Sequence, residues 1–186
     1  MRIPIKTLMG DQEVLGGSAE GRRLMARLLQ EVKEPPQPEP LFLDFAGIEV
    51  ATASFLREGP LALRHHLRAA GSRLYPVVVN AGEKVLDDLR LLLEVRNDAI
   101  FACHLSVDGE ARNVELLGRL DDKQATTLNL VQKLGETDTA KLMSSGDERS
   151  VKATAWNNRL AALVQKGLVM ESARGRAKRF RLPIEE

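Results

Sequence analysis

The stretch of residues 151–166 constrains this chain more than any other, because its apolar side chains repeat with the period of a helix. Trp156, Leu160 and Leu163 follow one another at intervals of four and three residues, which places them on one side of a helix. The other sides are polar, and Gly167 stands where a helix commonly ends. We therefore expect a helix that begins near Val151, continues to Lys166, and has one buried and one outward side.

Two more helices and a hairpin are expected around this helix. Asp121 or Asp122 can cap a helix over residues 121–134, which Gly135 would end. A short helix follows from about residue 137 to residue 145. After Gly167 the pattern predicts a strand over residues 168–170, a turn at residues 174–176 and a return strand over residues 179–182. The last third of the chain is thus three helices followed by a basic hairpin.

This order resembles the winged helix-turn-helix family of bacterial transcription regulators. The stretch that carries the resemblance is ATAWNNRLAALVQKGLVMESARGRAKRFRLP, residues 153–183, and the likeness in element order extends back to Leu120. In that family the third helix holds apolar residues where Trp156, Leu160 and Leu163 stand. A KGLV exit and a basic hairpin, the wing, then follow. The resemblance implies an α+β domain that binds double-stranded DNA with its third helix in the major groove.

The residue types on the outward surfaces suit that chemistry. Thr and Asn side chains can hydrogen-bond to base edges, whereas Lys and Arg suit phosphates and narrow minor grooves. Asn is also unfavourable inside helices, which favours a contact role for the two asparagines. The predicted DNA-binding residues are Lys152, Thr154, Asn157, Asn158, Arg159, Arg174, Arg176, Lys178 and Arg179. Two alternatives stay open: charged hairpins are often merely solvated, and some winged helices bind only proteins.

The charge distribution separates the two parts of the chain. Residues 119–186 hold 13 Lys and Arg against 9 Asp and Glu, a net charge of +4, whereas residues 1–118 hold 14 against 17, a net charge of −3. A basic module behind an acidic one indicates that only the C-terminal part contacts nucleic acid.

Residues 1–118 alternate between strand and helix patterns. Expected strands cover residues 2–8, part of 41–51, 74–80, 99–107 and 114–117, and expected helices cover residues 18–32, 52–70 and 83–96. Ser18 is the expected cap of the first helix, and Gly59-Pro60 should kink or split the second. Four prolines make residues 33–40 a connection. The pattern predicts an α/β domain with a mixed sheet and packed helices.

The N-terminal part resembles STAS-like domains through EGRRLMARLLQEV and LFLDFAGIEVATASFLRE. In these domains an LDF-x-G-V strand runs into a helix that opens at a Ser, and here Ser54 occupies that position. The family's Asp two residues earlier is Thr52, and the Gly after the Ser is Phe55. The resemblance implies that Ser54 is a regulatory phosphosite, where a phosphate would meet a helix N-terminus. The alternative is that Thr52 or Ser54 only caps the helix.

The remaining reactive side chains do not form a recognisable site. Cys103 is the only cysteine and lies in an apolar run, so we expect a small buried residue. His65-His66 has no ligand partner at metal-site spacing, and Asp44 could pair with an Arg or cap a turn. The sequence contains no phosphate-binding loop, dinucleotide fingerprint or nucleophile–base motif. We therefore predict no enzyme activity, no metal and no cofactor.

Together these features predict a two-domain transcriptional regulator. A STAS-like domain over residues 1–118 would sense or bind a partner, and a winged helix-turn-helix over residues 119–186 would bind an operator as a homodimer. No signal segment or long apolar run is present, which predicts a cytoplasmic protein that does not enter membranes. The alternative is a partner-switching signalling protein that acts through protein–protein contacts, with Ser54 as its switch.

Overall fold

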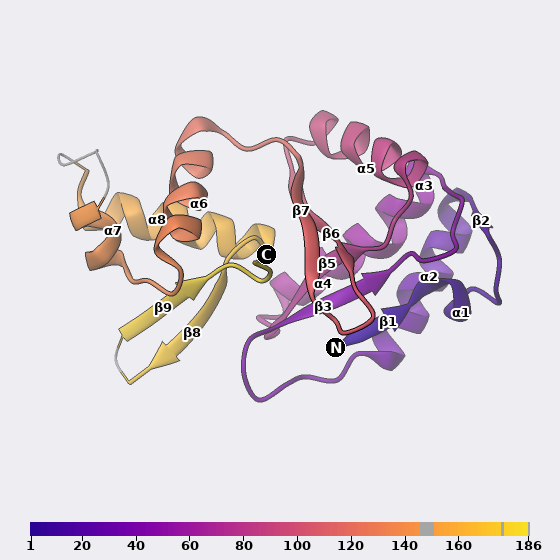
Figure 1. Cartoon of the computed structure of the whole chain (residues 1–186), viewed down its shortest axis with the longest axis horizontal. Coiled ribbons are helices and arrows are strands. Elements are labelled where there is room, and N and C mark those ends of the chain that lie inside the picture. Colours follow the sequence, from indigo (N-terminus) through magenta and orange to yellow (C-terminus); the bar gives the residue numbers. More distant parts are fainter. Residues whose placement is uncertain (146–150, 176, 186) are drawn as a thin grey trace.

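A five-stranded mixed sheet lies in the middle of the molecule, between a group of helices and the C-terminal part (Figure 1). The computed structural model describes residues 1–145, 151–175 and 177–185. The strands are β1 (Arg2–Pro4), β3 (Glu39–Asp44), β5 (Leu74–Val79), β6 (Ala99–Leu105) and β7 (Ala111–Gly118), adjacent in that order. The first four run parallel, and β7 is antiparallel to β6. The expected mixed α/β fold is confirmed.

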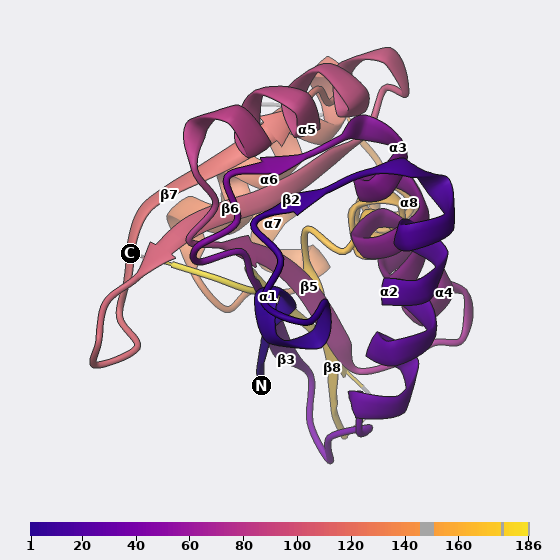
Figure 2. The same ribbon diagram turned by 90° about the vertical axis from the view of Figure 1, so that its right-hand side faces the viewer.

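Helices of the N-terminal part cover one face of this sheet, as the view from that side shows (Figure 2). They are α2 (Gly17–Glu31), α3 (Ala53–Leu56), α4 (Ala62–Ala69) and α5 (Glu83–Val95). Their apolar sides form one core with alternate strand residues such as Leu43, Val78 and Ile100. In the described part of the chain, no helix has the length and apolar character needed to cross a membrane.

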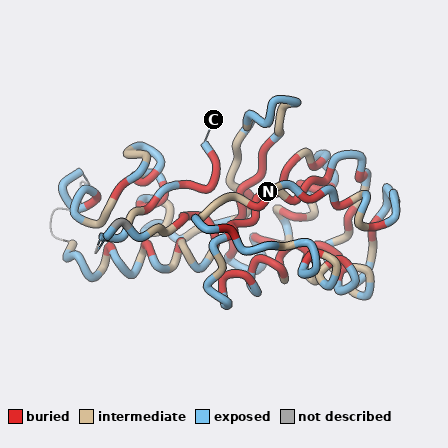
Figure 3. The backbone as a smooth tube through the Cα atoms, turned by 90° about the horizontal axis from the view of Figure 1, so that it is seen from below, coloured by how far each residue is buried: buried red, intermediate tan, exposed pale blue. Residues whose placement is uncertain are grey.

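The C-terminal part packs against the opposite face of the sheet. It consists of α6 (Asp122–Leu134), α7 (Thr139–Ser145), α8 (Ala153–Lys166) and the strands β8 (Met170–Arg174) and β9 (Ala177–Arg181). Val77, Val79 and Phe101 share a hydrophobic cluster with Trp156 and Phe180. All residues of β5 and the first five residues of β6 are buried, so these two strands are enclosed on both faces (Figure 3). This two-sided burial explains why residues 74–79 are apolar throughout instead of alternating.

The prediction of one strand over residues 2–8 is wrong beyond Pro4. Pro4 pairs with Asp44, the last residue of β3, so no partner strand remains for the residues that follow. Backbone hydrogen bonds then become local: Ile5–Leu8 forms α1, and the amide of Met9 donates to the carbonyl oxygen of Ile5 at 3.0 Å. A short parallel pair of β2 (Val14–Leu15) and β4 (Val50–Ala51) was also not expected.

Two predicted helix signals have different outcomes. Ser18 does not cap α2, because the helix already begins at Gly17 and Gly16 is its N-cap. Thr52 does cap α3, accepting a hydrogen bond from the amide of Phe55 at 3.5 Å. The expected interruption at Gly59-Pro60 is present as a π-helical turn over Arg57–Leu61, after which α4 continues.

A buried carboxylate, Asp98, joins α4 to the end of α8. It forms an ion pair with Arg64, whose side chain is 1% exposed, and its Oδ1 lies 3.4 Å from Nζ of Lys166. The same ammonium donates to the carbonyl oxygen of Asn97 at 2.9 Å. Burial by itself raises the pKa of Asp98, but a hydrogen bond from His65 and the charge of Arg64 outweigh it and hold this pKa well below its usual range.

Replacing this carboxylate should therefore destabilise the fold. Asp98→Asn leaves the Arg64 guanidinium buried without its counter-ion, and the free energy of unfolding should fall by about 3–5 kcal/mol. Urea denaturation followed by circular dichroism measures the loss. Glu110→Gln is the control, because its ion pair with Arg112 is exposed at the surface and should contribute little. A loss in Asp98→Asn no larger than in the control would contradict the assigned role.

The pH dependence has a definite sign. The folded state holds the pKa of Asp98 below its ordinary value, so the stabilising contribution is present above about pH 4 and is lost as the pH falls below it. The difference in unfolding free energy between wild type and Asp98→Asn should shrink in acid and stay constant near neutrality. Urea titrations between acidic and neutral pH test this, and a constant difference at all pH values would argue against it.

A fragment that ends at residue 118 should expose the second face of the sheet. Val77, Val79 and Phe101 would lose the cover that Trp156 and Phe180 provide. An apolar patch of this kind on an open sheet promotes association. We expect the fragment to bind a hydrophobic dye and to elute as aggregates in size-exclusion chromatography, whereas the full chain should do neither. A fragment that stays monomeric and binds no dye would show that the sheet does not need this cover.

Candidate nucleic-acid interface

The interface is built around α8, which is held by its buried side. Trp156, Leu160 and Leu163 are each at most 1% exposed and belong to the core beneath the sheet. Gly167 ends the helix in the left-handed conformation, with φ of 77°. This is the expected role of a glycine at that position, because a side chain would disfavour the positive φ. The helix is thus fixed in position, and its other side is open.

The outward side of α8 carries part of the predicted contact set. Lys152, which precedes the first turn, and Thr154, Asn157 and Asn158 are all exposed. Thr154 and Asn158 are four residues apart and therefore lie on the same face, one turn above the other. Both side chains are exposed, so this part of the helix surface faces solvent in the described chain.

Two predicted helix residues also contact neighbouring elements. Asn157 accepts a hydrogen bond through Oδ1 from the hydroxyl of Thr139 at 2.6 Å, which links α8 to the start of α7. Arg159 is half-buried, and its guanidinium carbon lies 5.0 Å from the centre of the Trp156 ring. Both residues therefore help to position α8, in addition to any contact with a ligand.

The hairpin of β8 and β9 is attached to the helices at a third extended segment. Thr137 pairs with Phe180, and each amide donates to the other carbonyl oxygen at 2.9 Å. Arg179 forms an ion pair with Asp138 at 2.8 Å, while Asp138 also accepts from the amide of Lys141 at the start of α7. Asp138 and Thr139 were missed from the sequence, although an Asp before a helical run is a known capping signal.

Of the remaining predicted contact residues of the hairpin, Lys178 is the one whose side chain the structure describes. Lys178 is largely exposed and forms an ion pair with Glu171 at 2.8 Å. The backbone of Arg174 belongs to β8, but its side chain lies outside what the structure describes, and Arg176 lies outside the described residues altogether. The structure thus brings Lys178 and Arg179 onto one strand, two or more residues from the turn.

Ser54, the candidate phosphosite, lies in the first turn of α3. It is half-buried, and its hydroxyl oxygen is 3.2 Å from that of Thr52. The Thr52 hydroxyl caps the helix and also accepts a hydrogen bond from the amide of Gly17 at 3.1 Å. Thr52, not Ser54, is therefore the capping residue.

The other reactive residues have structural partners. Asp44 accepts hydrogen bonds from Arg2, from the amide of Ala46 and from the side-chain amide of Asn80, which confirms the predicted pairing with an Arg. Cys103 is 6% exposed and belongs to the core, as expected. Within the described ranges, no three His, Cys, Asp or Glu side chains are grouped closely enough to hold a metal ion.

Comparisons with known proteins add no further assignment. The chain matches no protein-family profile, no curated protein sequence and no solved structure.

The Cys103 thiol should be unreactive in the folded protein. Burial raises its pKa to about 11, so the nucleophilic thiolate is scarce at neutral pH. A colorimetric disulfide reagent at pH 8 should label native protein at least about a hundredfold more slowly than urea-unfolded protein, in line with that scarcity. The unfolded chain is the internal control. Native labelling at the rate of the unfolded chain would show that the thiol is accessible.

Proposed function

We propose that this protein is a DNA-binding transcriptional regulator whose C-terminal part is a winged helix-turn-helix. The observation that carries the proposal is the uncovered side of α8, where Lys152, Thr154 and Asn158 are exposed while Trp156 fixes the opposite side in the core. A helix of this kind fits the major groove, and its N-terminal residues are those that reach base edges.

The residues divide into two roles under this proposal. Thr154 and Asn158 read base edges, because their short polar side chains donate and accept hydrogen bonds. Lys152 and Lys178 contact phosphates and contribute affinity without sequence preference. The net charge of +4 over residues 119–186 supports the same assignment.

The hairpin of β8 and β9 corresponds to the wing in this proposal. Its attachment through the Thr137–Phe180 pair and the Arg179–Asp138 ion pair gives it a fixed place beside α7 and α8. Arg174 and Arg176 belong to the wing tip by sequence and would lie along the backbone or in the minor groove. We also assign Arg159 and Asn157 to the interface, in addition to their contacts with neighbouring elements.

The N-terminal part acts, in this proposal, as a STAS-like domain that senses a ligand or binds a protein partner. Its mixed sheet with helices α2 to α5 on one face supports the assignment. The contact of Lys166 with Asp98 gives this part a direct connection to the end of α8. We further propose that the protein is cytoplasmic and binds as a homodimer, because a two-fold dimer matches the two halves of a palindromic operator.

Selection of bound sequences from random duplex DNA, performed at two salt concentrations, tests the proposal. Wild type should enrich a palindromic consensus, and its affinity should fall steeply with salt. Asn158→Ala should relax preference at particular bases, with a cost of about 1–3 kcal/mol for the cognate sequence. Lys152→Gln should weaken all sequences alike and reduce the salt slope by about one.

Lys84→Gln is the matched control, since it removes the same charge from an exposed position on α5, on the far side of the sheet. It should bind DNA as wild type does. If wild type retains no duplex at low salt, or if Asn158→Ala and Lys152→Gln both bind as the control does, the proposed surface is wrong. A protein partner that the full chain captures and that Ser54→Asp loses would then favour the partner-switching function.

A further inference from the structure

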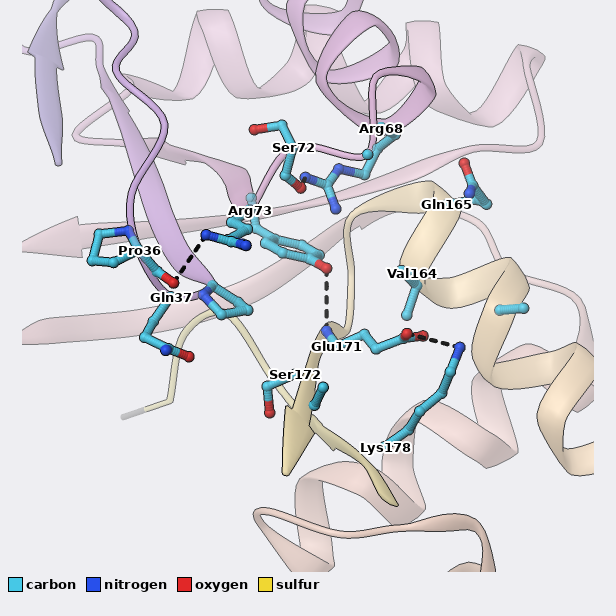
Figure 4. A pocket seen from close by; sticks show the side chains of 15 residues that line it. Pro36, Gln37, Arg68, Ser72, Arg73, Val164, Gln165, Glu171, Ser172 and Lys178 are labelled. Atoms are coloured by element: carbon cyan, nitrogen blue, oxygen red, sulfur yellow. Dashed lines mark hydrogen bonds and ion pairs between the residues drawn. The ribbon is translucent and has the colours of Figure 1, made fainter. Parts of the chain in front are cut away.

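A cleft of about 620 Å³ lies where the N-terminal part meets α8 and the hairpin. One wall is formed by Pro36, Gln37 and the segment from Arg68 to Arg73, and the other by Gln165, Glu171 and Lys178 (Figure 4). A hydrogen bond joins the two walls: the Tyr75 hydroxyl accepts from the amide of Glu171 at 3.1 Å. Clefts at such junctions are frequent sites for small ligands.

The decisive residue in this cleft is Arg68. It is 6% exposed, and its guanidinium carbon lies 3.8 Å above the Tyr75 ring. One of its terminal nitrogens donates to the carbonyl oxygens of Ser72 and Leu74, while its buried Nε has no partner. In the described part of the chain, no carboxylate lies within ion-pair distance of this guanidinium.

Arg64, one turn earlier on α4, shows what a buried arginine ordinarily requires. It too is almost fully buried, and its Nε also has no partner, but Asp98 neutralises its charge directly. A buried charge without a counter-ion is costly, and carbonyl oxygens and an aromatic face compensate it only in part. The difference between two arginines on the same helix therefore indicates that Arg68 lacks an anion.

Two more cations face the same space. Arg73 is exposed and donates to the carbonyl oxygens of Pro35 and Pro36, at 3.3 and 3.0 Å, from the edge of the cleft. Lys178 approaches from the hairpin with its partner Glu171. Glu34 is also near, but its carboxylate is bound by the Ser72 hydroxyl and the Arg73 amide. The cations outnumber the carboxylate that lines the cleft.

We propose that this cleft binds a small ligand through an oxyanion, a phosphate or carboxylate group, with Arg68 as its buried anchor and Arg73 and Lys178 closing on it from the two walls. Arg suits this task because its planar donors match oxyanion geometry. The bound group links the N-terminal part to the hairpin. The inference goes beyond the proposed function and does not depend on it, because the site requires no DNA.

Titration with inorganic phosphate, and separately with succinate, tests the site at constant ionic strength. The readout is the ¹H–¹⁵N signal of the Arg68 Nε group, identified by its absence from Arg68→Gln. We expect a saturable shift with at least one probe. Arg73→Gln and Lys178→Gln should each weaken the affinity by about tenfold, as the loss of one charge-assisted contact predicts. Arg112→Gln, which removes an equally exposed arginine from β7, should leave it unchanged.

Several outcomes would overturn the site. The site is wrong if neither probe produces a saturable shift. It is also wrong if Arg73→Gln, Lys178→Gln and Arg112→Gln all bind the probe with the same affinity. If neither probe binds while Arg73→Gln lowers duplex affinity, the cleft receives a backbone phosphate and not a free ligand. Should Arg68→Gln fail to fold, Arg68→Lys identifies the signal instead, and the two exposed variants still decide the question. Because these titrations contain no DNA, their failure leaves the proposed function untested and intact, and the reverse also holds.

Discussion

The structure depends on the burial of β5 and β6 from both sides. Successive residues of β5 belong to different cores: Val78 packs with the N-terminal helices, whereas Val77 and Val79 pack with α8 and the hairpin. Neither core can form completely without the sheet, which therefore couples the two parts of the chain mechanically. The proposed regulator would need such coupling, because a change at its sensing part would have to alter the position of its DNA-reading part.

Polar contacts at the same junction connect the N-terminal part to particular ends of α8 and the hairpin. Lys166 reaches Asp98 from the last turn of α8, and the Glu171 amide reaches Tyr75 from the first strand of the hairpin. The two elements proposed to contact DNA are thus each fastened to the N-terminal part at their inner ends. Their outer ends carry Thr154 and the wing tip. A displacement at the junction would be passed to α8 as a whole, because the helix is packed along its buried side.

Local patterns predicted most of the elements, since periodicity and capping are properties of neighbouring residues. The stripe of Trp156, Leu160 and Leu163, a cap at Thr52 or Ser54 and the stop at Gly167 all required only short-range information, and the structure selects Thr52 as the cap. The strand predicted beyond Pro4 was wrong because its continuation depended on where β3 ends, which is a long-range property. The second contact of Asn157 with Thr139 likewise depends on how α7 lies against α8.

The cleft could not be predicted from sequence patterns, because its residues come together only in the folded chain. In sequence, Arg64 and Arg68 are equivalent positions on an amphipathic helix. Only the fold brings Asp98 to the first and places the second between Tyr75 and the hairpin. Under the proposed anion binding, the uncompensated charge of Arg68 is tolerable, since the bound ligand would supply the missing stabilisation. The residues that leave this charge uncompensated would then also make the junction respond to that ligand.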